Sequence, residues 1–107
     1  NVYVSLQKCD LAIEEYAKAL SLKPDVPETL IGIGKCHKIF GDNLKAISYF
    51  KQALEINPEM DAVYRELGSI YYFELDDKKT AGFYLKQAIR LNPKYPDNPI
   101  ILNMIKK

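Results

Sequence analysis

The chain repeats itself with a period of 34 to 35 residues, and this limits its fold more than any other feature. Three 13-residue segments align without gaps: AIEEYAKALSLKP (12–24), AISYFKQALEINP (46–58) and AGFYLKQAIRLNP (81–93). Their prolines, Pro24, Pro58 and Pro93, are 34 and 35 residues apart. A period of this length is typical of proteins built from stacked supersecondary units.

Each of the three segments is predicted to form an amphipathic helix. The second segment shows the pattern: it begins with Ala46 and has a second alanine, Ala53, seven residues later. Large apolar residues lie between the alanines at helical spacing. The alanines let a neighbouring helix approach closely, while Phe50 fills the space beside them. The proline at the end of the segment lacks an amide hydrogen and stops the helix.

A second helical pattern precedes two of these segments, LIGIGKCHKIF (30–40) and YRELGSIYYFE (64–74). The two stretches align, with Gly34 matching Gly68. A glycine within a helix costs about 1 kcal/mol relative to alanine. Its recurrence in register therefore predicts a position where two backbones approach closely. Gly41 and Asp42 are predicted to form the turn and to cap the next helix.

These residues resemble the tetratricopeptide repeat family, a 34-residue helix-turn-helix with Leu-Gly, Tyr, Ala, an aromatic residue, Ala and Pro at fixed intervals. The resemblance implies an all-α fold, a right-handed α-solenoid of helix-turn-helix repeats. It divides the chain into a partial repeat (1–26), a full repeat (27–60) and a full repeat with one inserted residue in the turn 75–80 (61–95). The first repeat begins midway along its first helix, so we expect a fragment of a longer protein. Residues 96–107 are expected to be a terminating helix or a truncated fourth repeat.

Candidate catalytic residues are few. His37 is the only histidine, and on a helix its side chain points about 100° away from that of Cys36. We therefore expect a packed histidine in place of the tyrosine that the family usually has there. Asp76 and Asp77 precede two lysines in a turn, where helix capping is the expected role. We expect no catalysis, no metal site and no cofactor within these residues.

The two cysteines bear on the cellular compartment, and the charge balance bears on the class of partner. Cys9 and Cys36 match neither a disulfide framework nor a metal-ligand spacing, so reduced, buried thiols are expected. With no targeting segment in view, reduced thiols favour a cytoplasmic location. The apolar runs are too short to span a membrane. A formal net charge of +1 disfavours nucleic acid and anionic membranes as partners.

The resemblance also indicates a binding surface, because the first helices of stacked repeats line a concave face. An apolar strip bordered by basic side chains favours a peptide with apolar anchors and some acidic character. The alternative left open is that Tyr72 and Phe73 pack against a neighbouring helix or another part of the same protein. The candidate binding residues are Ile31, Lys35, Lys38, Ile39, Arg65, Glu66, Ser69, Tyr72 and Phe73.

The predicted function is that of a protein interaction or scaffold module, which binds a peptide or partner protein in the concave groove. The alternative is a regulatory or substrate-recruiting segment of a larger enzyme, and RNA binding is a third hypothesis. One subclass of the family clamps the C-terminal carboxylate of heat-shock chaperones with Lys, Asn and Arg. The matching positions here are Gly32, Ala62 and Glu66, so that binding is not expected. The isolated chain is expected to self-associate through its open N-terminal edge or to be only marginally stable.

Overall fold

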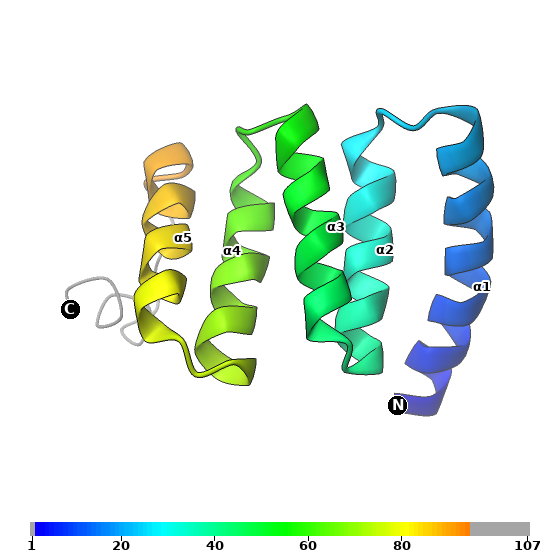
Figure 1. Cartoon of the computed structure of the whole chain (residues 1–107), viewed down its shortest axis with the longest axis horizontal. Coiled ribbons are helices and arrows are strands. Elements are labelled where there is room, and N and C mark those ends of the chain that lie inside the picture. Colours follow the sequence, from blue (N-terminus) through cyan, green and yellow to red (C-terminus); the bar gives the residue numbers. More distant parts are fainter. Residues whose placement is uncertain (1, 95–107) are drawn as a thin grey trace. The chain divides into compact units, whose positions relative to one another are not determined.

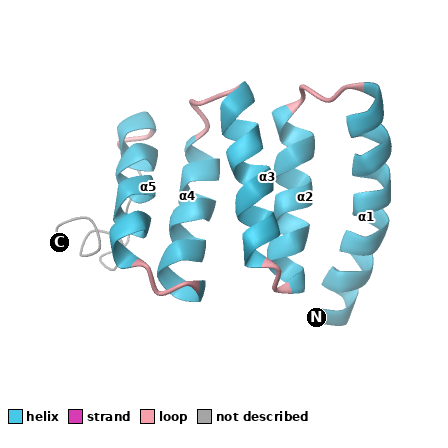
Figure 2. Cartoon of the chain, in the orientation of Figure 1, coloured by secondary structure: helices cyan, strands magenta, loops and turns pink. Residues whose placement is uncertain are grey.

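The computed structural model describes the backbone of residues 2–94 and the side chains of residues 6–94. Every regular element in that part of the chain is helical, as Figure 2 shows, so the predicted all-α fold is confirmed. The chain divides into two compact units, Asn1–Pro58 and Glu59–Lys107. In chain order (Figure 1), the elements are α1 (Val2–Leu22), α2 (Pro27–Phe40), α3 (Asn43–Ile56), α4 (Asp61–Ser69), η1 (Ile70–Glu74) and α5 (Lys78–Leu91).

Proline ends the helices as the sequence predicts. The helices α1, α3 and α5 end at Leu22, Ile56 and Leu91, each two residues before the proline of its repeated segment. The residue before a proline is sterically pushed out of the helical region, and the proline itself cannot donate a hydrogen bond. This local rule therefore sets where the second helix of each repeat ends.

In the first unit, α2 contacts both α1 and α3. The predicted small residues of α3, Ala46 and Ala53, have no exposed surface, and neither has Phe50 between them. A Cβ atom placed on Gly34 of α2 would lie 2.8 Å from Cε1 of Phe50. The recurring glycine therefore leaves room for a ring from the partner helix, whereas the sequence predicted a close approach of two backbones.

The second unit repeats this packing with an aliphatic side chain. In α5, Ala81 and Ala88 have no exposed surface and Leu85 is 2% exposed. A Cβ atom on Gly68 of α4 would lie 2.7 Å from Cγ of Leu85 and 3.4 Å from the backbone oxygen of Ala81. A substituted side chain would collide with its neighbour in either unit. The glycine is thus required by the side chain that covers it.

The first repeat departs from the prediction, because α1 is one continuous helix from Val2 to Leu22. We expected a truncated first helix followed by a separate second helix. In the second repeat the break is made by Gly41, whose φ is +86°, and by Asp42, whose carboxylate accepts a hydrogen bond from the backbone N–H of Lys45. The equivalent positions in the first repeat hold Gln7 and Lys8, which are both good helix formers. Nothing local interrupts the helix there.

The prediction of reduced cysteines is wrong. Cys9 of α1 and Cys36 of α2 are joined by a disulfide, with their Cα atoms 5.3 Å apart. Both residues are 6% exposed, so the expected burial is confirmed. The bond forms because α2 folds back along α1 and brings together residues 27 positions apart in sequence. The cytoplasmic location loses the support that it drew from reduced thiols.

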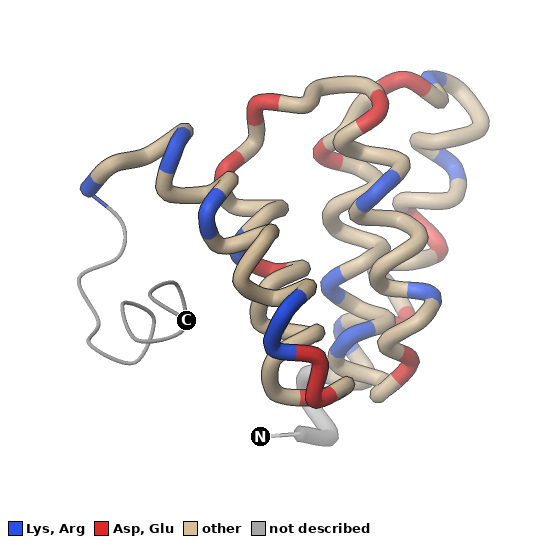
Figure 3. Tube along the Cα trace, turned by 60° about the vertical axis from the view of Figure 1, so that its left-hand side comes forward, with Lys and Arg blue, Asp and Glu red and all other residues tan. Residues whose placement is uncertain are grey.

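Two further predictions concern the ends and the surface. The terminating helix or fourth repeat expected at 96–107 lies outside the described residues. Among the residues that the structure describes, no helix combines the length and the apolar character needed to cross a bilayer. In Figure 3, acidic and basic positions are interspersed along the trace.

Candidate interaction surface

One face of α2 carries four of the candidate residues, of which Lys35 and Ile39 are exposed and Ile31 and Lys38 are half-buried. Gly34 contacts Phe50 of α3, and Cys36 is bonded to Cys9 of α1. At about 100° of rotation per residue, Gly34 and Cys36 are about 200° apart, and the four candidate residues of α2 lie within an arc of about 100° between them. Ile39 within this arc is 47% exposed. The four candidate residues on the arc are Ile31, Lys35, Lys38 and Ile39.

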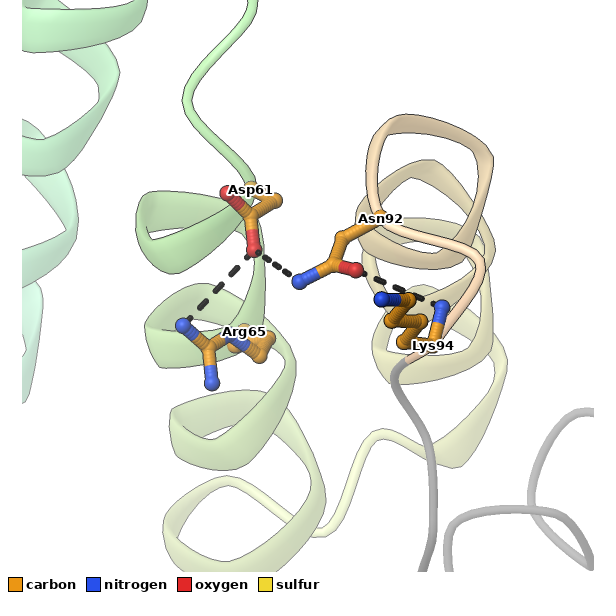
Figure 4. Close-up of polar contacts among 4 residues, drawn as sticks. All are labelled: Asp61, Arg65, Asn92 and Lys94. Carbon is orange, nitrogen blue, oxygen red and sulfur yellow. Dashed lines mark hydrogen bonds and ion pairs between the residues drawn. The ribbon is translucent and has the colours of Figure 1, made fainter.

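The second unit holds the other candidate residues, and Arg65 is already engaged there. Its guanidinium forms an ion pair with the carboxylate of Asp61, with an N–O distance of 3.7 Å (Figure 4). The same carboxylate accepts a hydrogen bond from the side-chain amide of Asn92 at 3.4 Å. This network connects the start of α4 to the end of α5. Arg65, Glu66 and Ser69 are all half-buried, so they offer a partner less surface than the sequence suggested.

The end of the first helix in this unit winds as a π-helix over Ile70–Glu74. The backbone N–H of Leu75 donates to the carbonyl of Ile70 at 3.1 Å, and that of Asp77 donates to Tyr71 at 2.7 Å. Asp76 follows with a φ of +51°, in the left-handed region that Gly41 occupies in the other repeat. The three residues 75–77 stand where the other repeat has only two, 41 and 42. The predicted inserted residue thus lies in this turn.

Tyr72 and Phe73 of η1 form an aromatic pair at this turn. Their rings are 4.9 Å apart and nearly perpendicular. The ammonium group of Lys78, in the first turn of α5, lies 5.8 Å from the centre of the Tyr72 ring, close enough for a cation–π attraction. Tyr72 is half-buried, whereas Phe73 is 66% exposed. Phe73 is therefore the larger apolar surface that this unit offers.

His37 packs as the sequence predicts. It is half-buried, and its ring stacks on Tyr49 of α3 at 5.4 Å with the planes 2° apart. In the second unit the matching residues, Tyr71 and Tyr84, stack at 5.6 Å. The histidine thus takes the place of one ring in a repeated aromatic pair.

Groups that could perform chemistry have structural roles. Cys36, the neighbour of His37, is held in the disulfide with Cys9 and offers no thiol. Asp77 caps α5, because its carboxylate accepts hydrogen bonds from the backbone N–H and the hydroxyl of Thr80. Within residues 6–94, no three His, Cys, Asp or Glu side chains come together as a metal site would require.

Comparison with known families agrees with this repeat architecture. The sequence matches the tetratricopeptide repeat family over residues 1–26, 27–60 and 62–95. The chain belongs to the tetratricopeptide repeat family. The resemblance inferred from the sequence is therefore confirmed, together with the helical repeat fold that it implied.

Relatives within the family have diverse roles. The photosystem I assembly protein Ycf3 of Cyanophora paradoxa is 34% identical over 98 residues, covering 77% of this chain and 57% of Ycf3. The chain thus spans about half the length of this relative. A UDP-N-acetylglucosamine–peptide N-acetylglucosaminyltransferase of Giardia intestinalis is 34% identical over 78% of this chain, which is 6% of the transferase.

A solved tetratricopeptide structure shares the fold. The first repeat domain of Spaghetti (RPAP3), bound to the HSP90 peptide SRMEEVD, superposes with a TM-score of 0.79. It covers 97% of this chain and 79% of its own, at 20% identity. At this level of identity the likeness concerns the fold alone. In our chain Gly32, one of the positions matched to the chaperone-tail clamp, is covered by Tyr16 of α1, whose hydroxyl would lie 2.7 Å from a Cβ there.

Sequence reasoning missed two residues of this candidate surface. Lys78 was not singled out, because its position over Tyr72 depends on how the turn 75–77 returns the chain. The repeat alignment could have found it, since the inserted residue marks that turn. Leu75, 39% exposed, was missed for the same reason. No local sequence signal indicated the disulfide that joins α2 to α1.

Proposed function

We propose that this chain is a non-catalytic tetratricopeptide module that binds a peptide segment or partner protein through two faces. The first is the face of α2 that carries Lys35 and Ile39, and the second is the face of α4 and η1 that carries Tyr72 and Phe73. One observation carries the proposal. Ile39 and Phe73 occupy equivalent positions in the two full repeats, and they are 47% and 66% exposed. This recurrence at one register position distinguishes Ile39 and Phe73 from the singly scattered apolar residues that are normal on a protein surface.

The side chains around these anchors define the partner's chemistry. Lys35, one helical turn before Ile39, is exposed, and Lys78 lies beside Tyr72. Apolar groups bordered by ammonium groups favour a peptide that combines apolar anchors with carboxylates. The assembly role in the name of Ycf3 supports a protein partner, and the peptide bound to RPAP3 supports a peptide ligand.

The experiment selects ligands from a phage-displayed library of random peptides on the immobilised chain. The selected peptides are then titrated against Phe73→Ala and Ile39→Ala. Matched controls are Phe83→Ala on α5 and Leu44→Ala on α3, because these residues are 57% and 74% exposed on the second helices of their repeats. Loss of an anchor at a contact centre costs about 2 kcal/mol, or roughly 30-fold in Kd.

We expect acidic, apolar-containing peptides whose affinity falls about 30-fold in at least one anchor variant and changes less than about twofold in the controls. Equal peptide affinity for all four variants would show that the interface does not include Ile39 or Phe73. Failure to select any peptide above background would contradict a peptide-binding function.

The second candidate function is substrate recruitment within a larger enzyme. The observation that favours it is the 34% identity to part of the Giardia glycosyltransferase. If a catalytic domain adjoins this segment, Phe73→Ala in the full-length enzyme should raise KM for a protein acceptor. Turnover of a short acceptor that contacts only the catalytic domain should stay unchanged. Equal effects on both acceptors would argue against recruitment.

A further inference from the structure

The helix α1 is attached covalently to the first unit at two points. At its C-terminal end, residues 23–26 connect Leu22 to the start of α2. The second point, the disulfide from Cys9 to Cys36, lies 13 residues upstream of Leu22, which is about 20 Å along the helix. The two anchors thus hold one long segment of α1 against α2.

Among its described side chains, α1 buries fewer residues than the other helices of the unit. Among its side chains from Leu6 to Leu22, only that of Cys9 is fully buried, while Ile13 and Leu20 are partly exposed. In α3, by contrast, four residues are buried: Ala46, Ile47, Phe50 and Ala53. Because burial of apolar surface is the main force that docks a helix, the docking of α1 depends unusually strongly on its disulfide.

From this geometry we infer that the Cys9–Cys36 bond is a redox clasp, which fixes α1 on α2 when oxidised and lets α1 open when reduced. This inference goes beyond peptide binding and does not rest on it. Reduction requires a dithiol, from a protein or a small molecule. One thiolate of the dithiol attacks a sulfur of the disulfide, and the other cysteine leaves as a thiolate that takes up a proton. The second thiol then resolves the mixed disulfide.

The exchange transfers two electrons from the dithiol to the Cys9–Cys36 disulfide. The dithiol becomes a disulfide, and Cys9 and Cys36 become thiols. Reduction loosens α1 without unfolding the unit, because a cysteine thiol packs as a small apolar side chain. The residue equivalent to Cys36 in the second unit is Ile70, which has no exposed surface. Position 36 therefore remains a suitable core position after reduction, and the α2–α3 pair persists.

The experiment compares hydrogen exchange in the oxidised and reduced 107-residue chain. Intact mass after alkylation establishes the state of the cysteines, and dithiothreitol serves as the dithiol. In the reduced chain we expect amides of α1 to exchange about 100-fold faster, in line with the stabilisation that a disulfide typically gives. Amides of α3 and α5 should change less than about threefold.

The double variant Cys9→Ala/Cys36→Ala controls for direct effects of the reductant. Its α1 amides should exchange at the fast rate with or without dithiothreitol. Three results would contradict the redox-clasp proposal. They are full alkylation of both cysteines in the wild-type chain after oxidation, equal hydrogen-exchange rates of the α1 amides in the two redox states, and an acceleration of the α3 amides on reduction that equals that of the α1 amides. The last result would show that the bond stabilises the whole unit and does not control α1 selectively.

Discussion

At the scale of single residues, small side chains and the large ones that cover them define the helix contacts. Gly34 lies under Phe50 in the first unit, and Gly68 lies under Leu85 in the second. The same position thus tolerates a ring or an aliphatic group above it, provided that the residue below has no Cβ. This accounts for the glycine in mid-helix, despite its cost of about 1 kcal/mol in helix propensity.

The first prediction concerns the alanines of these contacts. Ala53→Leu should lower the free energy of unfolding by about 1 to 3 kcal/mol or more, because extra methylenes would enter a fully packed contact. Ala53 has no exposed surface. Ala17, which is exposed on α1, provides the matched control Ala17→Leu, with an expected change near zero. Thermal denaturation followed by circular dichroism measures both, and an unchanged melting temperature for Ala53→Leu would contradict the packing argument.

The second prediction concerns the cap of α5. The Thr80 hydroxyl and then its backbone N–H hold the pKa of Asp77 below its ordinary value of 3.8; Lys79 adds to this and desolvation opposes it. Because the folded pKa is the lower one, the cap stabilises the fold above pH 3.8 and this contribution is lost as the pH falls through the folded pKa.

Thr80→Val removes the hydroxyl and should therefore raise the pKa of Asp77 toward 3.8. It should also weaken the dependence of stability on pH in the acidic range. A carboxyl carbon NMR titration of both proteins measures the shift. An identical pKa in the variant would show that the hydroxyl hydrogen bond does not control this group.

At the scale of elements, the turn residues decide whether a repeat divides into two helices. Gly41 and Asp42 separate α2 from α3, whereas Gln7 and Lys8 let α1 continue. In the second unit Asp76 takes the left-handed conformation at a φ of +51°, which costs a residue other than glycine about 1 kcal/mol or more.

The third prediction follows from that strained turn. Asp76→Gly should raise the free energy of unfolding by about 0.5 to 1 kcal/mol, because glycine adopts this conformation without strain. The reciprocal change, Gly41→Asp, should lower it by a similar amount, since Gly41 has a φ of +86° with open space around it. Chemical denaturation measures both. A destabilised Asp76→Gly would show that the aspartate side chain makes a compensating interaction.

Most helices could be predicted from the sequence because their signals are local. Apolar spacing and prolines located α3 and α5, and Gly41 with Asp42 located the turn between α2 and α3. The continuity of α1 could have been predicted from Gln7 and Lys8, but the repeat alignment argued for a break. The disulfide could not be predicted, because it depends on how α2 folds back along α1. The exposure of Phe73, likewise, depends on the π-helical turn.

At the scale of the whole molecule, the repeats form two compact units that divide after Pro58. In stacked repeats each unit is stabilised by its nearest neighbours. The helix α1 exposes Leu11 and Leu22, at 64% and 84%. Large apolar side chains exposed on one helix favour contact with a second copy.

The fourth prediction is that the isolated chain self-associates through α1 or is only marginally stable. Light scattering over a range of concentrations should show an average mass that rises above 12.3 kDa. The variant Leu11→Glu/Leu22→Glu should shift association to higher concentration, because it replaces exposed apolar surface with charge. A strictly monomeric wild-type chain at high concentration, with a sharp melt at high temperature, would contradict this prediction.

The stacking of His37 on Tyr49 also provides an NMR signal that is specific to the first unit. The chain contains one histidine and no tryptophan, and the histidine ring lies parallel to that of Tyr49, 5.4 Å away. The circulating π-electrons of the tyrosine displace the imidazole C–H resonances from their positions in a free ring. Those two proton signals therefore report on the contact between α2 and α3 in the first unit, and an unfolding experiment that follows them can distinguish the melting of the first unit from that of the second.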